Sequence, residues 1–360
     1  MIPEETTAKE QAPEILDPAT YVKLIALQEN IPLGVHVDLT YRCDLACTHC
    51  YLETRKRKEL TLDEYRPLFA ELAALGTLYM LVSGGDIFVR KDALDILRAA
   101  AAHRFDITMI THAMAIDDEV ADALAEIDIK HVGVSVYHAD PEIHDRVTLS
   151  KGSHARTLAG IKKLRDRGIP VTMKCPVMAI NQGAERVMPA FADTNGTSLK
   201  INSTITGGNS GTDVLRELNM DMNGRADVSA CNLGHYGDLS EIMIKKPENV
   251  TCMAGHSSLY IGPDGVISPC SEFHNTFAGN IREQSLAKIW ENAPLFKEMR
   301  EIRRGSFTGC TTCENFSFCS LCPAHSLRET GSLTGSAPSK CEESQVIRYT
   351  FERQNSQSTG

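Results

Sequence analysis

Short apolar runs alternate with amphipathic stretches along the first two thirds of the chain. The runs are rich in β-branched residues, and each predicts a strand buried in a parallel sheet. They are Val35–Thr40, Leu78–Ser83, Ile107–Thr111, His131–Val136, Pro170–Val177 and Ser198–Asn202. Between them, apolar residues recur every three or four positions, which is typical of helices with one buried face. The pattern therefore predicts six βα units in an α/β fold with a parallel sheet.

One predicted helix carries clear signals at both ends. Thr61 is followed three positions later by Glu64, which makes a capping box, and Gly76 ends the apolar periodicity. We expect further helices at Asp92–Ala102 and Ala155–Arg167. Six βα units are fewer than the eight that close a barrel.

The alternation of strand and helix patterns ends near residue 245. Leu259–Cys270 predicts a hairpin that turns at Pro263-Asp-Gly265, and Ser285–Arg304 predicts one helix. The loops that follow have too few apolar residues to form a core, so we expect metal to hold them together. We expect four parts: an N-terminal segment (1–30), a barrel (31–240), a cysteine-rich domain (245–345) and a flexible polar tail (346–360).

Composition narrows the class of protein. The chain has 360 residues, a net charge of −10 and no secretory signal, and no apolar stretch approaches the roughly 20 residues of a membrane span. These features predict a cytoplasmic protein without a membrane anchor or a nucleic-acid surface. We interpret the basic run Arg55–Lys58 as a solvated linker. The 12 cysteines of a cytoplasmic protein indicate metal binding or catalysis more than disulfides.

Cys43, Cys47 and Cys50 lie in one loop directly after the first predicted strand. Three thiolates can hold a corner of a cubane iron–sulfur cluster, which normally takes four cysteines. The next cysteine, Cys175, lies within a strand pattern and is expected to be a buried core thiol. We therefore expect a 4Fe–4S cluster with one iron open to a non-protein ligand. Half of a zinc site is the alternative, although zinc prefers four ligands and paired cysteines.

The spacing Cys-x3-Cys-x2-Cys, followed by the aromatic Tyr51, resembles the radical S-adenosylmethionine (radical SAM) superfamily. The resemblance implies an open, partial (β/α)6 TIM-like barrel, with its chemistry at the carboxyl ends of the strands. It further implies that the open iron chelates SAM. The reduced cluster would cleave SAM to a 5′-deoxyadenosyl radical, which abstracts a hydrogen atom from the substrate.

Ser83-Gly84-Gly85-Asp86 is similar to the family's Gly-Gly-Glu-Pro motif, which binds the SAM amino group. The resemblance implies SAM contacts by Gly84, Gly85 and Asp86, with Asp in place of Glu and Ile87 in place of Pro. The alternative is a glycine turn in which Asp86 caps a helix.

Three further SAM contacts are implied by the resemblance. Ser135, at the end of the fourth strand, matches a serine that contacts the SAM carboxylate or ribose, and Arg146 matches a basic position that pairs with that carboxylate. Tyr51 would pack near the adenine. Capping, surface and core-packing roles are the respective alternatives.

Seven more cysteines gather near the C-terminus in a pattern similar to the SPASM extension of radical SAM enzymes. It departs from the family pattern at one spacing, with two residues instead of three between Cys319 and Cys322. The resemblance implies two auxiliary Fe–S clusters. The first would be held by Cys252, Cys270 and Cys322, and the second by Cys310, Cys313, Cys319 and Cys341.

The first auxiliary set lacks a fourth cysteine, because Met253–Pro269 contains none. Either this cluster has an open iron, or Cys231 supplies the missing ligand. A zinc ribbon is the alternative for the two Cys-x2-Cys pairs, but it leaves Cys252, Cys270 and Cys341 without a role.

The resemblance implies a peptide maturase that crosslinks a ribosomally made precursor, for example through a thioether or carbon–carbon bond. We expect a flavodoxin- or ferredoxin-type reductant as a partner. A separate leader-binding protein is also expected, because the stretch before the barrel is short.

Other functions remain open. They are dehydrogenation or epimerisation of a sugar or cyclitol, decarboxylation of a haem precursor, sulfatase maturation, and a non-enzymatic iron–sulfur scaffold or electron carrier. In sulfatase maturases an Asp directly after the second SPASM cysteine acts as base; this chain has Ser271 there, and Glu272 is the candidate substitute.

Overall fold

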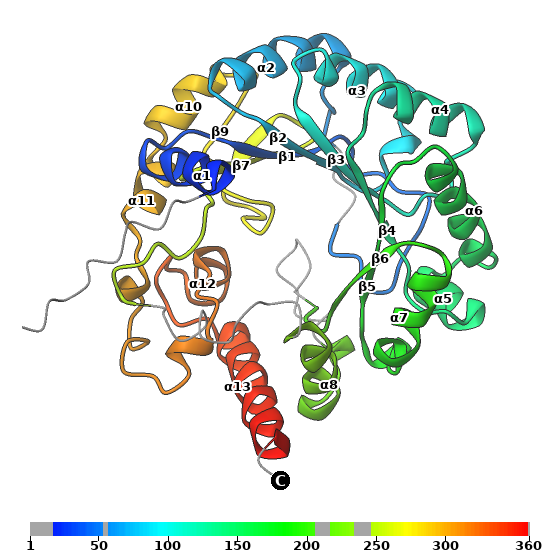
Figure 1. Cartoon of the computed structure of the whole chain (residues 1–360). Helices are drawn as coiled ribbons and strands as arrows, with labels where there is room; N and C mark the ends of the chain where they lie inside the picture. The colour runs from blue at the N-terminus through cyan, green and yellow to red at the C-terminus, as the bar shows by residue number, and fades with distance from the viewer. Residues whose placement is uncertain (1–16, 53–56, 206–216, 234–245, 359–360) are drawn as a thin grey trace, which may run out of the picture.

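A strongly curved sheet runs through the molecule, and most helices lie on its outer side (Figure 1). The computed structural model describes residues 17–52, 57–205, 217–233 and 246–358. Within these residues the sheet has nine strands in the order β6-β5-β4-β3-β2-β1-β7-β8-β9. The strands are β1 Gly34–Asp38, β2 Tyr79–Ser83, β3 Asp106–Thr111, β4 His131–Ser135, β5 Val171–Pro176, β6 Ser198–Asn202, β7 Ser258–Ile261, β8 Val266–Ser268 and β9 Gly279–Asn280.

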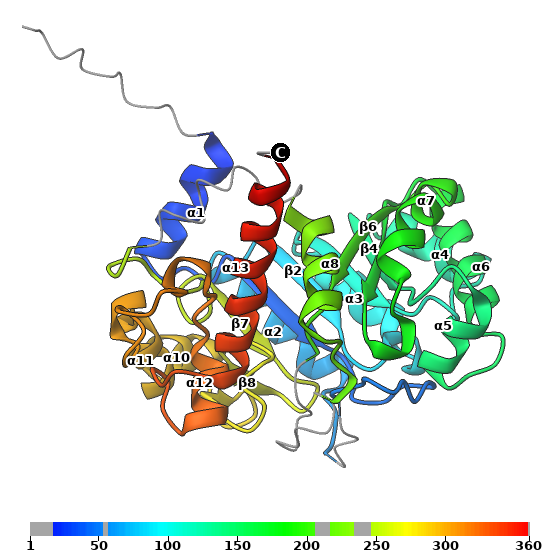
Figure 2. The ribbon, with the colours of Figure 1, turned by 90° about the horizontal axis from the view of Figure 1, so that it is seen from below.

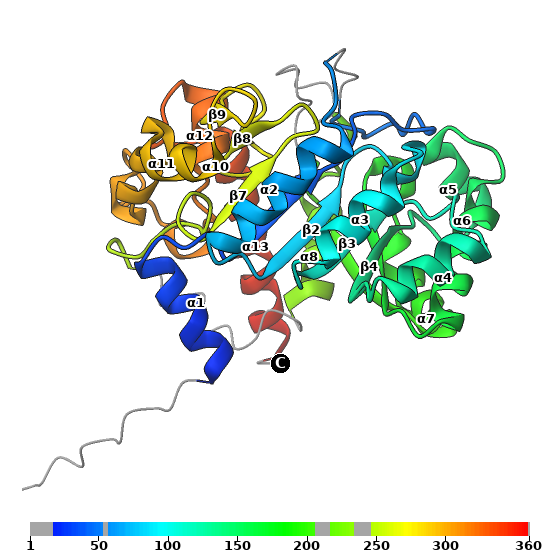
Figure 3. The ribbon, with the colours of Figure 1, turned by 90° about the horizontal axis from the view of Figure 1, so that it is seen from above.

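Strands β1 to β6 are parallel and form the six predicted βα units. The sheet does not close on itself, so the partial (β/α)6 barrel is confirmed. Figures 2 and 3, which show the molecule from below and from above, show the helices of the barrel packed around the sheet. The helices are α1 Pro18–Gln28, α2 Leu62–Ala74, α3 Ala93–Ala101, α4 Asp118–Glu126, α5 Pro141–Thr148, α6 Ser153–Asp166, α7 Ala184–Thr194, α8 Met222–Leu233, α10 Leu286–Asn292, α11 Pro294–Glu301, α12 Pro323–Thr330 and α13 Pro338–Ser358.

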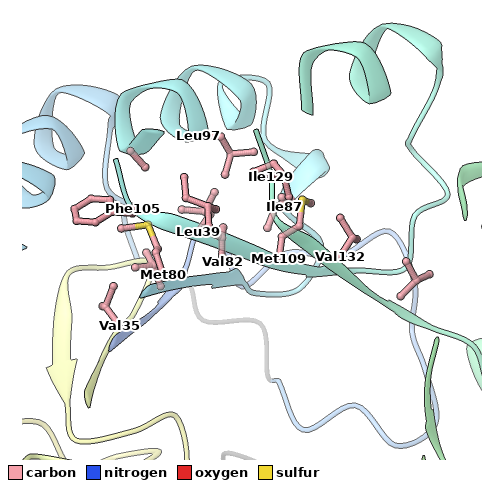
Figure 4. Close-up of a cluster of buried hydrophobic side chains, with 14 of the residues drawn as sticks. Val35, Leu39, Met80, Val82, Ile87, Leu97, Phe105, Met109, Ile129 and Val132 are labelled. Carbon is pink, nitrogen blue, oxygen red and sulfur yellow. The ribbon is translucent and has the colours of Figure 1, made fainter. Parts of the chain in front are cut away.

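The main core lies between the sheet and the outer helices. Alternate residues of each strand point outward into it, as period-two burial requires. Figure 4 shows Val35, Met80, Val82 and Met109 from neighbouring strands in one buried cluster with Leu97 of α3. Burial of these side chains stabilises the barrel by roughly 25 cal/mol for each Å² of apolar surface removed from water.

The C-terminal domain joins the barrel through the sheet itself. The hairpin strands β7 and β8 are antiparallel as predicted, and β7 also pairs in parallel with β1. A second contact is the ion pair between Arg282 and Glu64 of α2, with 2.6 Å between Nε and Oε1. The Arg282 guanidinium lowers the pKa of Glu64 to about 2.

Two expectations about the C-terminal region are wrong. The single helix predicted over 285–304 is two helices, because Ala293 turns to extended backbone and Pro294 starts α11. The predicted flexible tail after 346 continues α13 instead. Polar side chains hold it against α8, with Tyr349 donating to Asn223 at 3.0 Å and Arg353 to Asp227 at 2.8 Å.

Among the described residues, no helix is both long and apolar enough to cross a lipid bilayer.

Candidate functional site

A cavity of about 480 Å³ lies inside the curved sheet. Its walls come from six neighbouring strands and from the cysteine loop after β1, so it lies where a parallel barrel carries its chemistry. The strand residues are His36, Ser83, Ile110, Thr111, Ser135, Lys174, Pro176, Lys200 and Asn202. The size suits a cofactor or a small substrate, since ligand pockets are roughly 300–1,000 Å³.

Cys43, Cys47 and Cys50 all line this cavity. The loop closes on itself through the bond from the Cys50 amide to the Cys47 carbonyl, 3.0 Å long. Burial raises the pKa of Cys47 to about 12, and a hydrogen bond from the Tyr137 hydroxyl partly opposes this shift. A bound metal would supply the positive charge that a buried thiolate needs, so the donor set fits an iron–sulfur cluster.

Gly84 and Gly85 lie against the start of the cysteine loop. A Cβ on Gly84 would lie 2.4 Å from the carbonyl oxygen of Thr40, and a Cβ on Gly85 would lie 2.1 Å from that of Arg42. The Gly85 amide also donates to Thr40 at 2.9 Å. Both glycines therefore allow two backbone segments to meet, and this contact sets the position of the cysteine loop. Both also line the cavity.

Asp86 is buried beneath the cavity and is not part of its lining. Its carboxylate accepts from the Thr111 hydroxyl at 2.5 Å and from the amides of His112 and Phe88 at 3.1 Å each. Asp86 thus caps the short helix η1 (Ile87–Val89), as the alternative interpretation expects. Its predicted contact with SAM stays a prediction.

His112 was not identified from the sequence, yet it lies at the cavity beside Cys43. Its Nε2 is 2.7 Å from Asp44 Oδ1 and 3.3 Å from Asp86 Oδ2, and its Nδ1 lies 3.1 Å from the Met114 amide nitrogen. Burial lowers the pKa of His112, but Cys43 and the two carboxylates outweigh it and raise the pKa to about 9. The ring links the cysteine loop to the glycine loop.

The other predicted SAM contacts divide into two groups. Ser135 and Tyr51 line the cavity, whereas Arg146 is exposed on α5 and is not part of the lining. The ring of Tyr51 lies 6.3 Å from the ring of His274. Tyr51 therefore lies where the cysteine loop meets the C-terminal domain.

The first auxiliary set comes together in the structure. Burial and then the neighbouring Cys322 raise the pKa of Cys270, and burial, with a smaller contribution from Cys322, also raises the pKa of Cys252. Cys231 lies apart from this set and is exposed on α8. Its thiol lies 3.5 Å from the Asp227 carbonyl oxygen. Its pKa is raised by burial and then by the negative charges of Glu185 and Asp227. The structure does not bring Cys231 to this set, which leaves three cysteines there.

The second auxiliary set also comes together. Burial is the main reason that the pKa of each of Cys310, Cys319 and Cys341 is raised, and a neighbouring cysteine of the same set is the next. Cys313 is one of these neighbours. The buried Arg304 lowers the pKa of both Cys310 and Cys319. Four thiols beside a buried cation fit a second cluster.

Glu272, the candidate base, lies near the first set. Its Oε2 is 3.3 Å from His325 Nε2, 3.7 Å from Arg328 and 3.9 Å from His274. Burial alone would raise the pKa of Glu272, but these basic neighbours lower it. The carboxylate is therefore ionised, as a proton acceptor must be.

Sequence reasoning also missed two lysines of the cavity, Lys174 of β5 and Lys200 of β6. Each interrupts a strand that was expected to be buried, and a charged residue within such a strand is a signal that could have found them. Cys175, by contrast, is a fully buried core thiol as predicted.

Comparisons with known proteins agree with this division of the chain. Residues 37–187 match the family model of the radical SAM superfamily, and residues 252–315 match SPASM, an iron–sulfur cluster-binding domain.

Three curated relatives resemble the chain over most of its length. An AdoMet-dependent heme synthase of Methanosarcina barkeri is 27% identical and covers 84% of this chain and 94% of its own. The mycofactocin maturase MftC of Mycobacterium ulcerans is 28% identical, with 81% and 82% covered. The PqqA peptide cyclase of Bradyrhizobium diazoefficiens is 26% identical, with 82% and 88% covered.

The fold resembles that of Streptococcus suis SuiB, solved with S-adenosylmethionine and with the precursor peptide SuiA. The TM-score is 0.67 at 16% identity, with 93% of this chain and 83% of SuiB covered in both cases.

Proposed function

The chain belongs to the radical SAM superfamily and carries a C-terminal SPASM domain, and from this premise we propose that it is a peptide maturase. Its cofactors are a 4Fe–4S cluster, SAM and auxiliary iron–sulfur clusters. When bound, these groups supply the electron that cleaves SAM and the acceptor for an electron from the substrate. The reaction is oxidative crosslinking of a ribosomally made precursor peptide.

One observation carries the proposal: Tyr51 joins the two cysteine regions at the cavity. It follows Cys50 directly, it lines the cavity, and its ring meets His274, four residues after Cys270. Tyr51 therefore links the cavity, where the radical would form, to the domain that would take up an electron. An electron carrier has no need of such a cavity.

In this proposal Cys43, Cys47 and Cys50 hold the SAM cluster, and Ser135 and the glycine loop orient SAM. Cys252, Cys270 and Cys322 hold the first auxiliary cluster, which has an open iron. The second auxiliary cluster takes four cysteines: Cys310, Cys313, Cys319 and Cys341. Glu272 is the candidate proton acceptor, since it is ionised and close to Cys270.

The names of related proteins support a peptide as the substrate. One relative is a peptide cyclase, another is a maturase, and the similar SuiB structure holds a precursor peptide. We further propose a flavodoxin- or ferredoxin-type reductant, because the SAM cluster must receive its electron from outside. A separate leader-binding protein completes the proposed system.

The second candidate is decarboxylation of a carboxylated haem precursor. The observation in its favour is the similarity to the heme synthase of Methanosarcina barkeri, which extends over 334 aligned residues. The relatives that are named as a maturase and as a peptide cyclase favour the peptide.

The test is anaerobic turnover of the reconstituted protein with dithionite and SAM. We expect roughly 11–12 iron atoms per chain and formation of 5′-deoxyadenosine, which Cys47→Ala abolishes. A precursor peptide encoded beside the gene should lose two hydrogen atoms by mass spectrometry, while coproporphyrin III stays unchanged. Loss of carbon dioxide from the porphyrin, with no change in the peptide, would make the second candidate correct. Absence of 5′-deoxyadenosine in every condition would refute both.

A further inference from the structure

Two lysines stand side by side on the wall of the cavity. Lys174 of β5 is in register with Lys200 of β6, and on its other side with Ser135 of β4. Residues in register on parallel strands point to the same face of the sheet. All three side chains line the cavity, so they form one row across three strands.

The fold makes room for the first of these lysines. A Cβ on Gly133 of β4 would lie 2.5 Å from Cε of Lys174, and Ile110 of β3 is the next neighbour at 3.5 Å. Gly133 therefore leaves a slot in which the aliphatic part of Lys174 crosses β4 towards β3. Lys174 is half-buried there, while Lys200 is exposed on β6, the edge strand.

Carboxylates are absent from the described lining of the cavity. Among the residues that the structure describes, this lining contains the two lysines, three histidines and the three cysteines proposed as cluster ligands, but neither Asp nor Glu, although the whole chain carries a net charge of −10. Within the described part of the chain, neither lysine makes an ion pair or a side-chain hydrogen bond. A half-buried ammonium group without a carboxylate partner is unfavourable until an anion binds to it.

The pKa of Lys174 agrees with this description. Burial lowers it, and the positive charge of Lys200 lowers it further. The free protein therefore carries an electrostatic cost that an anionic ligand would remove.

We propose that Lys174 and Lys200 anchor a carboxylate of the substrate. Within the proposed function, on which this inference rests, the carboxylate belongs to an acidic residue of the precursor peptide, near the side chain that reacts. In this proposal the exposed Lys200 of β6 meets the peptide first, and the half-buried Lys174 holds the acid deeper in the cavity.

The carboxylate of SAM is the competing occupant, and the position of Lys174 disfavours it. The cysteine loop follows the carboxyl end of β1, whereas the Lys174 side chain lies over Gly133, two residues before Ser135 and so about 7 Å further from that end. SAM also brings a sulfonium and an ammonium for its single carboxylate, and so adds positive charge to the cavity.

The experiment is a selection of random displayed peptides on the reconstituted, SAM-loaded full chain. Four proteins are compared: wild type, Lys174→Met, Lys200→Met and Lys162→Met. Lys162 is an exposed lysine of α6 paired with Asp166, so its variant controls for net charge. We expect wild type and Lys162→Met to enrich Asp or Glu, and each cavity variant to bind the enriched peptides roughly tenfold more weakly or worse.

Two further measurements separate the possible occupants. The Kd of SAM should stay within about threefold in all variants, and Lys174→Met should melt no lower than wild type, because a strained charge is removed. A large loss of SAM affinity in the cavity variants would overturn the proposal in favour of the SAM carboxylate.

The remaining outcomes distinguish this inference from the proposed function. Peptides enriched without acidic residues would overturn the carboxylate anchor and leave the peptide maturase standing. Lysine-dependent binding of coproporphyrin III, with no peptide enriched, would support the anchor and overturn the peptide substrate.

Discussion

The barrel and the C-terminal domain bury their cysteines in opposite ways. The barrel core is built from aliphatic and aromatic side chains and contains one thiol, Cys175, while its three ligand cysteines lie on a loop outside the core. The core of the C-terminal domain is much smaller and contains Cys310 and Cys319, with Cys252, Cys270 and Cys322 packed against it. We therefore expect the barrel to fold before it binds metal and the second domain to need its proposed clusters to complete its core.

The two regions also differ in how charge surrounds the thiols. The cysteine loop of the barrel lies beside His112 and two carboxylates, and the cavity that it faces holds two lysines that make no ion pair with any described residue. The second auxiliary set has a buried cation of its own, Arg304. The cavity of the barrel can thus take up an added ligand. At the second auxiliary set, the negative charge of the thiols is balanced by a cation of the protein itself.

Removal of iron should produce the largest difference between the barrel and the C-terminal domain. Without clusters, we expect the segment 306–341 to lose amide-exchange protection by orders of magnitude, because cluster binding supplies its folding free energy. Strands β1 to β6 should keep their protection. Hydrogen exchange of the chelated protein measures both, and equal loss in both regions would contradict the proposed independence of the barrel.

Gly85→Ala should disable the barrel's cysteine loop and leave the other domain intact. The added Cβ would lie 2.1 Å from the Arg42 carbonyl oxygen, so the loop must move. We expect a loss of about four iron atoms per chain and no SAM cleavage. Gly34→Ala is the control, since its Cβ meets nothing within 4 Å. Full iron content in Gly85→Ala, by iron and sulfide assay, would rule out this role.

Arg304→Met should shift the potential of the second auxiliary cluster alone. The guanidinium donates to the carbonyls of Cys319 and Phe316 at 3.2 and 2.7 Å, and its positive charge favours the reduced cluster. We expect a fall on the order of 50–100 mV, measured by potentiometric EPR, with Arg304→Lys in between. Arg300→Met, which removes a cation stacked on Trp290, should leave all potentials unchanged.

The ion pair between Arg282 and Glu64 should contribute the smallest effect. Both side chains are 30% exposed, so solvent screens the pair, and a coupling of about 0.5–1 kcal/mol is expected. A double-mutant cycle with Glu64→Gln and Arg282→Met, followed by anaerobic thermal unfolding, measures it. A much larger coupling would mean that this pair, rather than the pairing of β1 with β7, joins the two regions.

Predictions made along a single segment agreed best with the structure. The capping box of Thr61 and Glu64, the hairpin that turns at Gly265 and the buried strand of Cys175 depend on neighbours in sequence. Contacts between distant segments were harder to foresee. The predicted SAM contact of Arg146 stays a prediction, although Arg146 is not part of the cavity lining, and the tail after 346 is a helix held by α8.

The sequence by itself determined the six parallel strands and the two cysteine regions, because hydrophobic period and cysteine spacing are local properties, and the family resemblance added the open barrel. Only the tertiary structure decided which side chains share the cavity. Lys174 and Lys200 are 26 residues apart in the chain, and the register of β5 with β6 puts them side by side. In the same way, Cys252, Cys270 and Cys322 meet through folding, while Cys231 does not join them. Electrostatic interactions and metal coordination depend on distances in space, and the amino-acid sequence alone does not give these distances.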